Sequence, residues 1–476
     1  MPFNSLYFVI FLLFSVIIFS GIKPKPQKIF LFLLNIFFYS CSNIYNIFII
    51  FILGLLSYFF SFIIYKHKNK FILFITIAIT VFPLLIYKYT NFLFIGILHI
   101  NISLDLSNII PLGLSFITLQ IVGFLIDIYK GKYNPEKNIL NYFIFISFFP
   151  IVTCGPIERA ASLLQQIKNL DNISFNYKRT VEGCRIILFG YLLKVFIAER
   201  LANIINIVYS DINSSSGLIL LITTFLFTIQ IYCDFCGYSY IALGSAKLLG
   251  LNITQNFNKP YFSQSITEFW TRWHISLSSW LKDYIYIPLG GNRCSKIRNY
   301  INILIVFFIS GLWHGANFTY ILWGILHGLI MVIERITKLN RKATKTSIKI
   351  IKTICTFLVV NFLWIFFRAS TISDAILLLK KIFLESIYDL SSLTSSSNIM
   401  QYLRNCNLSV LYCFIAAISL IIFFIYSFIT KNYNLPSEIL NNKPLIMRWI
   451  IYIILIFIIL TLGSTVGENQ FIYANF

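Results

Sequence analysis

Long apolar runs, separated by short polar stretches, make up most of the chain. These runs cover residues 4–21, 29–43, 45–65, 71–87, 91–101, 109–128, 139–152, 186–209, 216–233, 238–250, 300–313, 317–336, 353–367, 408–430 and 447–463. A helix needs about 20 apolar residues to cross a bilayer, so several runs are too short to cross alone. The pattern predicts an all-α polytopic membrane protein with about eleven to thirteen membrane helices, plus re-entrant or interfacial helices where protein covers the backbone.

The composition agrees with this pattern. Hydrophobic side chains make up 58% of the 476 residues and charged ones 12%, against about 25% charged residues in soluble domains. So few charges cannot cover a water-facing surface, which excludes an ordinary soluble enzyme, a disordered chain and a secreted disulfide scaffold. We expect a single membrane domain over residues 1–476.

The net charge of +21 comes from 38 Lys and Arg against 17 Asp and Glu. The basic residues fall between apolar runs, as in cytoplasmic loops, so they indicate orientation rather than nucleic-acid binding. The lysines between positions 23 and 28 place the first loop inside the cell and the N-terminus outside. The apolar stretch 6–20 is therefore expected to be a retained span, not a cleaved signal. The basic loop 338–352 is expected inside, and three spans follow it, so the last span ends outside. The tail 464–476 is therefore predicted to be extracytoplasmic.

Nine cysteines are spread along the chain. Cys233 and Cys236 have the spacing of a redox pair, but they lie in an apolar context beside Gly237, and no His/Cys pair follows at zinc spacing. We interpret them as small packing residues and expect no metal site.

The segment 252–300 is more polar than its surroundings. Charged or titratable side chains alternate there with tryptophans: Glu268, Arg272, His274, Lys282, Asp283 and Arg293, with Trp270, Trp273 and Trp280. Such a segment is too polar to span lipid and too aromatic for a solvated loop, so amphipathic, interfacial or re-entrant helices are expected. It forms either a membrane-surface anchor or the wall of a catalytic cavity.

A second polar motif, Ser310–Thr319, ends the next apolar run. That run measures about 20 Å at about 1.5 Å per residue, short of the ~30 Å bilayer core. His314 should therefore lie at membrane depth, at a helix break that Gly311 and Gly315 allow. An ionisable residue at this depth is a candidate functional residue, and the alternative is a histidine that only packs against its neighbours. His327, on the next helix, fits that packing role better.

A series of motifs follows along the chain: Asp234–Ser239, Asn256–Tyr261, Ser265–Tyr284, Ile287–Arg293 and Ser310–Asn317. Shorter ones precede them: Pro111–Phe116, Asp127–Tyr129, Phe148–Pro150 and Gly155–Ile157. Together they closely resemble the membrane-bound O-acyltransferase (MBOAT) family, and within it the bacterial alginate and peptidoglycan O-acetyltransferases. The resemblance covers most of the chain and is weakest in 369–445. It implies the MBOAT fold, with helices around a central cavity and residues 252–335 as the catalytic core segment.

The resemblance also implies a reaction. An acetyl group would pass from a cytoplasmic thioester, acetyl-CoA, to an extracytoplasmic hydroxyl on a cell-envelope or secreted polysaccharide. The catalytic histidine of the family falls on His314, the general base, and its second polar position falls on His274, which would orient the thioester. Related systems use a C-terminal tyrosine as an acyl relay, which here points to Tyr473, unless the aromatic tail is only an interfacial anchor.

Donor binding is expected to use polar and aromatic residues of the same region: Arg272, Lys282, Arg293, Trp313 and Asn317. The basic ones suit the phosphates of CoA, and they suit lipid headgroups equally well. We expect no permanently bound cofactor, since acetyl-CoA would be a substrate.

Two other functions stay open. A transporter or flippase for a lipid-linked polysaccharide would need inverted repeats and charged residues near mid-membrane, and neither is evident in the sequence. A structural membrane partner that recruits a soluble acetyltransferase would differ only in lacking activity. For the enzyme we expect a bacterial cytoplasmic (inner) membrane location, an extracytoplasmic acetyltransferase partner and contacts with membrane lipids, but no nucleic acid.

Overall fold

The computed structural model describes residues 1–41, 43–100, 111–153, 155–170, 175–392 and 408–463. In this part of the chain the regular secondary structure is entirely helical, which confirms the all-α prediction. The main helices are α1 (Leu6–Gly21), α2 (Pro24–Ser40), α3 (Ile44–His67), α4 (Lys70–Asn91), α5 (Leu114–Tyr129), α6 (Ile139–Ser147), α7 (Phe149–Val152), α8 (Ala160–Lys168), α9 (Tyr177–Tyr191), α10 (Glu199–Ser210), α11 (Gly217–Leu248), α12 (Ile266–Arg272), α13 (Ile275–Leu281), α14 (Lys296–His314), α15 (Phe318–Thr337), α16 (Thr346–Arg368), α17 (Ile372–Ser392), α19 (Val410–Thr430) and α20 (Leu445–Leu462).

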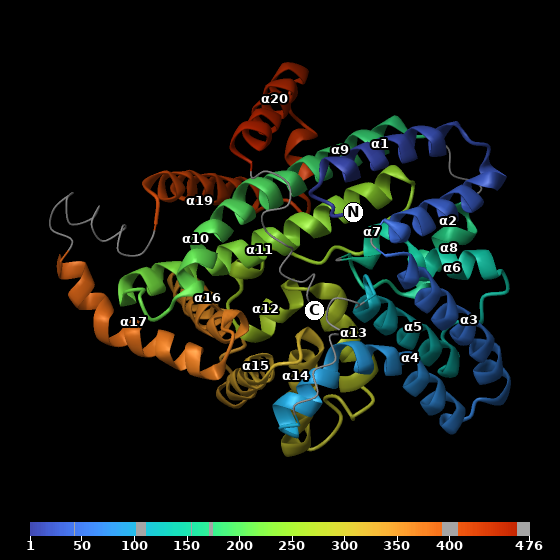
Figure 1. Ribbon diagram of the computed structural model, residues 1–476, viewed down its shortest axis with the longest axis horizontal. Coiled ribbons are helices and arrows are strands. Elements are labelled where there is room, and N and C mark those ends of the chain that lie inside the picture. Colours follow the sequence, from blue (N-terminus) through green and yellow to red (C-terminus); the bar gives the residue numbers. More distant parts are fainter. Residues whose placement is uncertain (42, 101–110, 154, 171–174, 393–407, 464–476) are drawn as a thin grey trace.

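The helices gather in two groups that follow the order of the chain. In Figure 1 the N-terminal helices α2 to α8, in blue to cyan, lie at one end, and the C-terminal helices α16, α17 and α19 lie at the other. Between them runs α11, which packs against α9, α10, α16 and α17. Helices α12 to α14 lie below α11 in this view, so the segment predicted to carry the chemistry lies between the two groups along the long axis of the molecule.

Eight described helices are long and apolar enough to cross a membrane, and two shorter apolar helices, α1 and α5, accompany them. The outer faces of several spans are apolar: no residue of α20 is buried, and Phe74 and Phe82 of α4 are 68% and 59% exposed. Apolar surface on this scale is suited to lipid, not water.

Two of the predicted runs, 216–233 and 238–250, are wrong as separate elements because they form one helix. The 32 residues of α11 run unbroken through Gly237, a length of about 48 Å at 1.5 Å per residue. A Cβ atom on Gly237 would lie 2.8 Å from the carbonyl oxygen of Gly190 on α9. This glycine therefore lets two helices touch and does not end one.

The predicted run 186–209 is likewise divided differently. It comprises the end of α9, a π-helical turn at Leu192–Ala198, and α10. The run 139–152 folds into the short buried helices α6 and α7.

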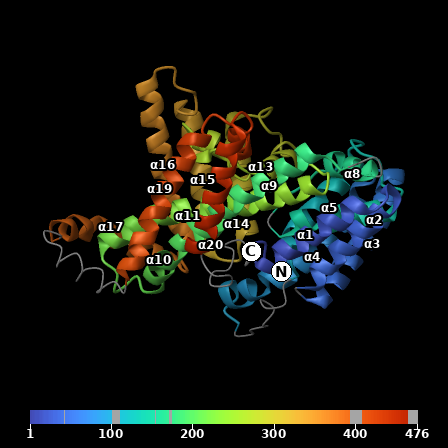
Figure 2. The same ribbon diagram turned by 90° about the horizontal axis from the view of Figure 1, so that it is seen from above.

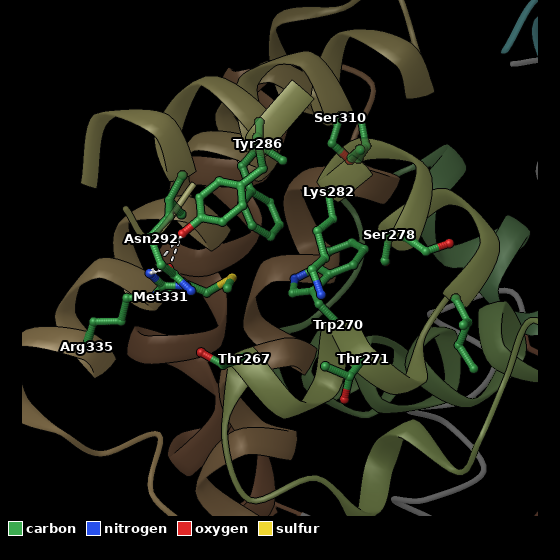
Figure 3. A pocket seen from close by; sticks show the side chains of 16 residues that line it. Thr267, Trp270, Thr271, Ser278, Lys282, Tyr286, Asn292, Ser310, Met331 and Arg335 are labelled. Carbon is green, nitrogen blue, oxygen red and sulfur yellow. Dashed lines mark hydrogen bonds between the residues drawn. The ribbon is translucent and has the colours of Figure 1, made fainter. Parts of the chain in front are cut away.

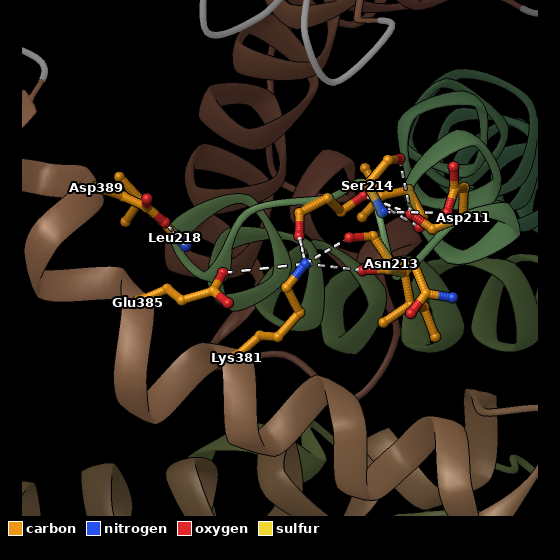
Figure 4. Close-up of polar contacts among 10 residues, drawn as sticks. Asp211, Asn213, Ser214, Leu218, Lys381, Glu385 and Asp389 are labelled. Carbon is orange, nitrogen blue, oxygen red and sulfur yellow. Dashed lines mark hydrogen bonds and ion pairs between the residues drawn. The ribbon is translucent and has the colours of Figure 1, made fainter.

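Helix α17 is fixed to the start of α11 by polar contacts (Figure 4). The Lys381 Nζ atom donates hydrogen bonds to the carbonyl oxygens of Asn213 (2.7 Å) and Ser215 (2.5 Å), and the Leu218 N–H donates to Asp389 (3.0 Å). Figure 2 shows α17 lying across the direction of α16. Its outer face is apolar, with Ile387 83% exposed, as in helices that lie along a membrane surface.

Candidate active site

His314 is the last residue of α14, as the glycine pattern predicted. The next residue, Gly315, is extended at φ −174°, and α15 begins after Asn317. The two helices pack closely: a Cβ atom on Gly311 would lie 2.4 Å from the carbonyl oxygen of Tyr320. A side chain at position 311 would therefore push α15 away from the histidine.

The His314 side chain lies in an aromatic cage at 1% exposure. Its ring centroid is 5.1 Å from Trp313, 5.1 Å from Trp323 and 5.4 Å from Phe367. The imidazole is thus held by packing within the protein and does not face lipid.

Helix α4 holds the end of α14 from the other side. The Lys88 ammonium donates to the carbonyl oxygen of Trp313, and the Tyr89 hydroxyl donates to that of Leu312 at 2.6 Å. Carbonyl groups in the last turn of a helix have no partner within the helix, and a cation there also complements the helix dipole. The sequence analysis did not identify Lys88, although a lysine at the end of an apolar run was the available signal.

His274 occupies a strained position at the start of α13. Its backbone is left-handed (φ 46°), its side chain is fully buried, and neither ring nitrogen has a hydrogen-bond partner among the described residues. Burial lowers the pKa of His274 to about 3, so the ring is neutral and carries one donor and one acceptor. Backbone strain together with unsatisfied buried polar atoms is typical of functional residues.

Aromatic rings connect the buried histidines. Trp313 lies 6.0 Å from His274 and 5.1 Å from His314 between ring centroids, and Trp323 lies 5.1 Å from His314 and 4.9 Å from His327. His327 accepts a hydrogen bond at Nδ1 from Trp270 Nε1 (3.2 Å). The structure therefore brings His274 and His314 together, and it gives His327 the packing role expected for it.

The polar segment 252–300 forms an inner wall and not a surface anchor. Its tryptophans are buried in protein: Trp270, Trp273 and Trp280 are 7%, 0% and 6% exposed. Interfacial tryptophans would instead present their rings to headgroups. Of the two predicted roles of this segment, membrane-surface anchor and cavity wall, the structure thus favours the cavity wall.

Glu334 of α15 fixes the start of this wall. Its carboxylate accepts hydrogen bonds from the backbone N–H groups of Ile266 (2.6 Å) and Thr267 (3.0 Å), the first residues of α12. An acidic residue in an apolar run was visible in the sequence, but its partner was not. We assign Glu334 the role of capping α12.

Replacing Glu334 with alanine is expected to lower the free energy of unfolding by about 1–3 kcal/mol, because the buried N–H of Ile266 and the partly buried N–H of Thr267 lose their acceptor. Thermal unfolding in detergent, followed by tryptophan fluorescence, measures the change. Glu385→Ala is the control, since that side chain is 42% exposed and pairs at 4.0 Å with Lys381, so its removal should change stability by no more than about 0.5 kcal/mol. Equal unfolding temperatures for Glu334→Ala and the native chain would contradict the capping role.

A cavity of about 440 Å³ lies between α12, α13, α14 and α15 (Figure 3). Its lining includes Ser310, one turn before His314, and Ile275, which follows His274. Lys282 and Arg335 also line it, whereas His274 and His314 themselves do not. The volume is within the roughly 300–1,000 Å³ of small-molecule sites.

Arg335, in the lining of this cavity, is held by three side-chain oxygens. Its Nη1 atom donates to Tyr286 (3.1 Å), Asn292 (3.2 Å) and Asn299 (2.5 Å). All three partners are neutral, so the positive charge of Arg335 is not neutralised by them. The sequence analysis missed Arg335 because it lies at the end of α15, outside the motifs.

The structure places the five residues predicted to bind the acetyl donor in different surroundings. Lys282 lines the cavity, whereas Arg272 and Arg293 are not among its lining residues, and Arg272 pairs with Glu268 at 2.7 Å. Trp313 contacts both candidate histidines. Asn317 caps α15 by accepting from the Thr319 N–H at 3.1 Å, and it donates to the carbonyl oxygen of Ser370 at 2.9 Å.

Two further predictions concern Tyr473 and a metal. Tyr473 lies outside the described residues. Among the residues that the structure describes, no three His, Cys, Asp or Glu side chains come together as metal ligands.

The sequence model of MBOAT, the membrane-bound O-acyltransferase family, matches residues 136–372. The chain is 38% identical over 289 residues to the probable alginate O-acetylase AlgI of Pseudomonas aeruginosa, covering 61% of this chain and 54% of that protein. It is 32% identical over 389 residues to the peptidoglycan O-acetyltransferase of Helicobacter pylori, covering 75% and 74%.

A more distant relative is the teichoic acid D-alanyltransferase of Bacillus subtilis, 28% identical over 227 residues, with 46% of this chain and 58% of that protein covered. The chain spans about half the length of the alginate O-acetylases it matches. The match to the Helicobacter pylori protein covers nearly three quarters of both partners. By this similarity and by the matched family model, the chain belongs to the membrane-bound O-acyltransferase family.

Proposed function

We propose that this protein is an O-acetyltransferase that passes an acetyl group from acetyl-CoA on the cytoplasmic side to a polysaccharide hydroxyl on the other side of the membrane. One observation carries the proposal: a single cavity is lined by Lys282 and Arg335 and also by Ser310 and Ile275, which lie one turn before His314 and next to His274. A polar donor cannot cross the bilayer, so the acyl group has to be handed over at membrane depth. Family membership supports the same reaction class.

The reaction needs a base close to the cavity, whose lining includes Ser310, one turn before His314, and Ile275, next to His274, but neither histidine itself. The acceptor oxygen attacks the thioester carbonyl carbon, a new C–O bond forms, the C–S bond breaks, and CoA leaves as its thiolate. His314 takes the proton of the attacking hydroxyl and returns it to the thiolate, so no net proton is gained or lost. His274 positions the thioester by a hydrogen bond from its neutral ring, whose nitrogens have no hydrogen-bond partner among the described residues.

The acceptor side of the proposal rests on the relatives. Two are named for the acetylation of alginate or peptidoglycan, so we propose a cell-envelope or secreted polysaccharide as final acceptor. An extracytoplasmic acetyltransferase would complete the transfer. Tyr473 remains the candidate relay between His314 and that partner.

The direct test uses the full chain in lipid nanodiscs with acetyl-CoA that carries a radiolabelled acetyl group. We expect CoA release to accompany transfer of the label to the protein or to an added polysaccharide. Hydrolysis-corrected CoA release no faster than with empty nanodiscs would refute the proposal. Movement of polysaccharide across the membrane without label transfer would favour the transporter.

The cations of the cavity provide a second prediction. Lys282→Gln and Arg335→Gln are each expected to raise KM for acetyl-CoA about tenfold, because a hydrogen bond to a charged group contributes roughly 1.5–3 kcal/mol and about 1.4 kcal/mol is a factor of ten. kcat should change little, since the role proposed for both residues is to bind the phosphates of CoA and not to move the proton. Initial rates against acetyl-CoA concentration separate the two constants.

Arg293→Gln is the matched control, because Arg293 is exposed and does not line the cavity. Arg335→Lys keeps the charge and should recover part of the loss. A KM that rises equally in the Arg293 variant would show that the effect comes from general surface charge and not from this cavity.

A further inference from the structure

A second cavity, of about 550 Å³, lies between α11, α16 and α19 and is closed at one side by the segment Lys259–Phe262. Its walls are apolar and largely aromatic, with Phe225, Phe357 and Phe423 from the three helices. None of the histidines lines it. Tyr261, in its wall, touches Trp273 with ring centroids 6.1 Å apart, and Trp273 touches Trp364 at 5.1 Å. An aromatic layer thus separates this cavity from the candidate catalytic residues.

The chemistry of the walls defines what fits. A sugar or the polar arm of CoA would leave its hydroxyl and amide groups without partners in such a space, which is costly. A hydrocarbon chain has no such groups. Polar side chains occur mainly toward one side, where Lys259, Thr353 and Thr430 contribute to the lining. The ligand is therefore an apolar chain with a polar end.

The cavity is open toward lipid. Ile354 of α16 and Phe424 of α19 both line it and are 53% and 61% exposed on the outer surface of the molecule. Both belong to helices long and apolar enough to cross the membrane. A lipid chain can therefore enter sideways from the bilayer without passing through water.

The polar side of the cavity belongs to the cytoplasmic leaflet by the charge pattern. Helix α16 begins within the basic segment 338–352, and α19 is followed by Lys431, so the start of α16 and the end of α19 are both expected inside. Thr353 lies near the start of α16, and Thr430 is the last residue of α19. Lys259 is the one cation among the lining residues of this cavity, and it lies on the same side as Thr430 because its ammonium donates to the carbonyl oxygen of Tyr433.

The backbone of Lys259 is held in an unusual conformation. Its φ is 49°, in the left-handed region, and the next residue is Pro260. A residue before proline is restricted to extended conformations, so this arrangement is doubly unfavourable. Strain of this kind is maintained where a side chain has to point in a defined direction.

We propose that this cavity binds one acyl chain of an anionic glycerophospholipid from the cytoplasmic leaflet, with the lipid phosphate at Lys259. Basic pockets between membrane helices on the cytoplasmic side are a recurring form of site for anionic lipids. The bound chain packs against Tyr232 and Tyr261, whose rings lie 6.3 Å and 6.1 Å from Trp273, the residue before His274. The lipid thereby supports the wall that positions this histidine.

Lipid retention tests the proposal independently of catalysis. The full chain is reconstituted in nanodiscs with equal amounts of phosphatidylcholine and phosphatidylglycerol, released, and weighed by native mass spectrometry. We expect one phosphatidylglycerol to remain bound in preference to phosphatidylcholine. Lys259→Gln should reduce that preference about fivefold, the effect of one lysine near an anionic lipid.

Leu420→Trp, from α19, fills the cavity and should abolish retention of either lipid. Lys66→Gln is the matched control: an exposed lysine at the end of α3, outside this cavity, whose loss should change nothing. The comparison of Lys259→Gln with the native chain tests the proposal even if Leu420→Trp does not fold, because Lys259→Gln alters no apolar packing. Equal retention of both lipids by the native chain, or the same preference in the Lys259 and Lys66 variants, would overturn the proposal.

Discussion

His314→Ala is expected to reduce acetyl transfer from acetyl-CoA by at least about a hundredfold while the protein still folds. A positioned general base contributes roughly 10²- to 10⁴-fold to such a reaction. The imidazole is enclosed by Trp313, Trp323 and Phe367, so water cannot readily replace it as base. Initial rates of CoA release from nanodisc-embedded protein provide the measurement.

The control for this experiment is His327→Gln. His327 is equally buried, lies on the adjacent helix and accepts a hydrogen bond from Trp270, which the glutamine oxygen can also accept. The turnover of His327→Gln should fall far less than that of His314→Ala. Both variants should elute from a size-exclusion column as the native protein does. If His314→Ala keeps more than half of the native rate, this histidine is not the base.

Lys194→Met is expected to destabilise the protein by about 3–5 kcal/mol, the usual cost of leaving buried charges without their partner. The Lys194 Nζ atom lies 2.6 Å from Asp234 Oδ1 and 3.4 Å from Glu199 Oε1, and the three side chains are 2–3% exposed. Glu199 also accepts a hydrogen bond from Asn4 at 2.6 Å. Thermal unfolding and the yield of folded protein in detergent both report the loss.

The charge argument can be separated from the loss of packing. Adding Glu199→Gln and Asp234→Asn to Lys194→Met removes all three charges, and this triple variant should recover most of the stability. Lys247→Met is the second control, because the Lys247–Glu182 pair is partly exposed and such pairs contribute only about 0–1 kcal/mol. A triple variant as unstable as the single one would show that shape, not charge, is what matters there.

The same three residues show where sequence reasoning reached its limit. Asp234 interrupts the hydrophobic pattern, which led to two predicted runs in place of one helix. In the structure Lys194, 40 residues away, neutralises it inside the protein, and α11 continues. A hydropathy scale counts the free-energy cost of burying each residue by itself and takes no account of a distant partner. A helix that contains a long-range ion pair therefore looks like two helices with a break between them.

Local signals succeeded where the cause was itself local. The end of α14 at His314 follows from the glycines around it, and the packing role of His327 follows from its apolar setting. The position of Arg335 depends instead on how α15 lies against η6 (Lys282–Tyr286), a π-helical segment whose Tyr286 accepts a hydrogen bond from Arg335. The inward-facing tryptophans of 252–300 likewise require the neighbouring helices. The composition of this segment was compatible with tryptophans at the membrane surface and with tryptophans in the protein interior.

The contacts from α4 to the end of α14 bear on how far this protein can be divided. Residues 136–372 match the family model, yet the carbonyl groups of Leu312 and Trp313 are held by Tyr89 and Lys88 from outside that stretch. A chimera could join the matched region of this chain to the N-terminal helices of a relative. We expect it to keep His314 in position only if the relative's helix supplies a cation and a hydroxyl at the depth of Lys88 and Tyr89. Helix α4 is therefore part of the structural unit that holds His314, and grafting experiments should preserve Lys88 and Tyr89.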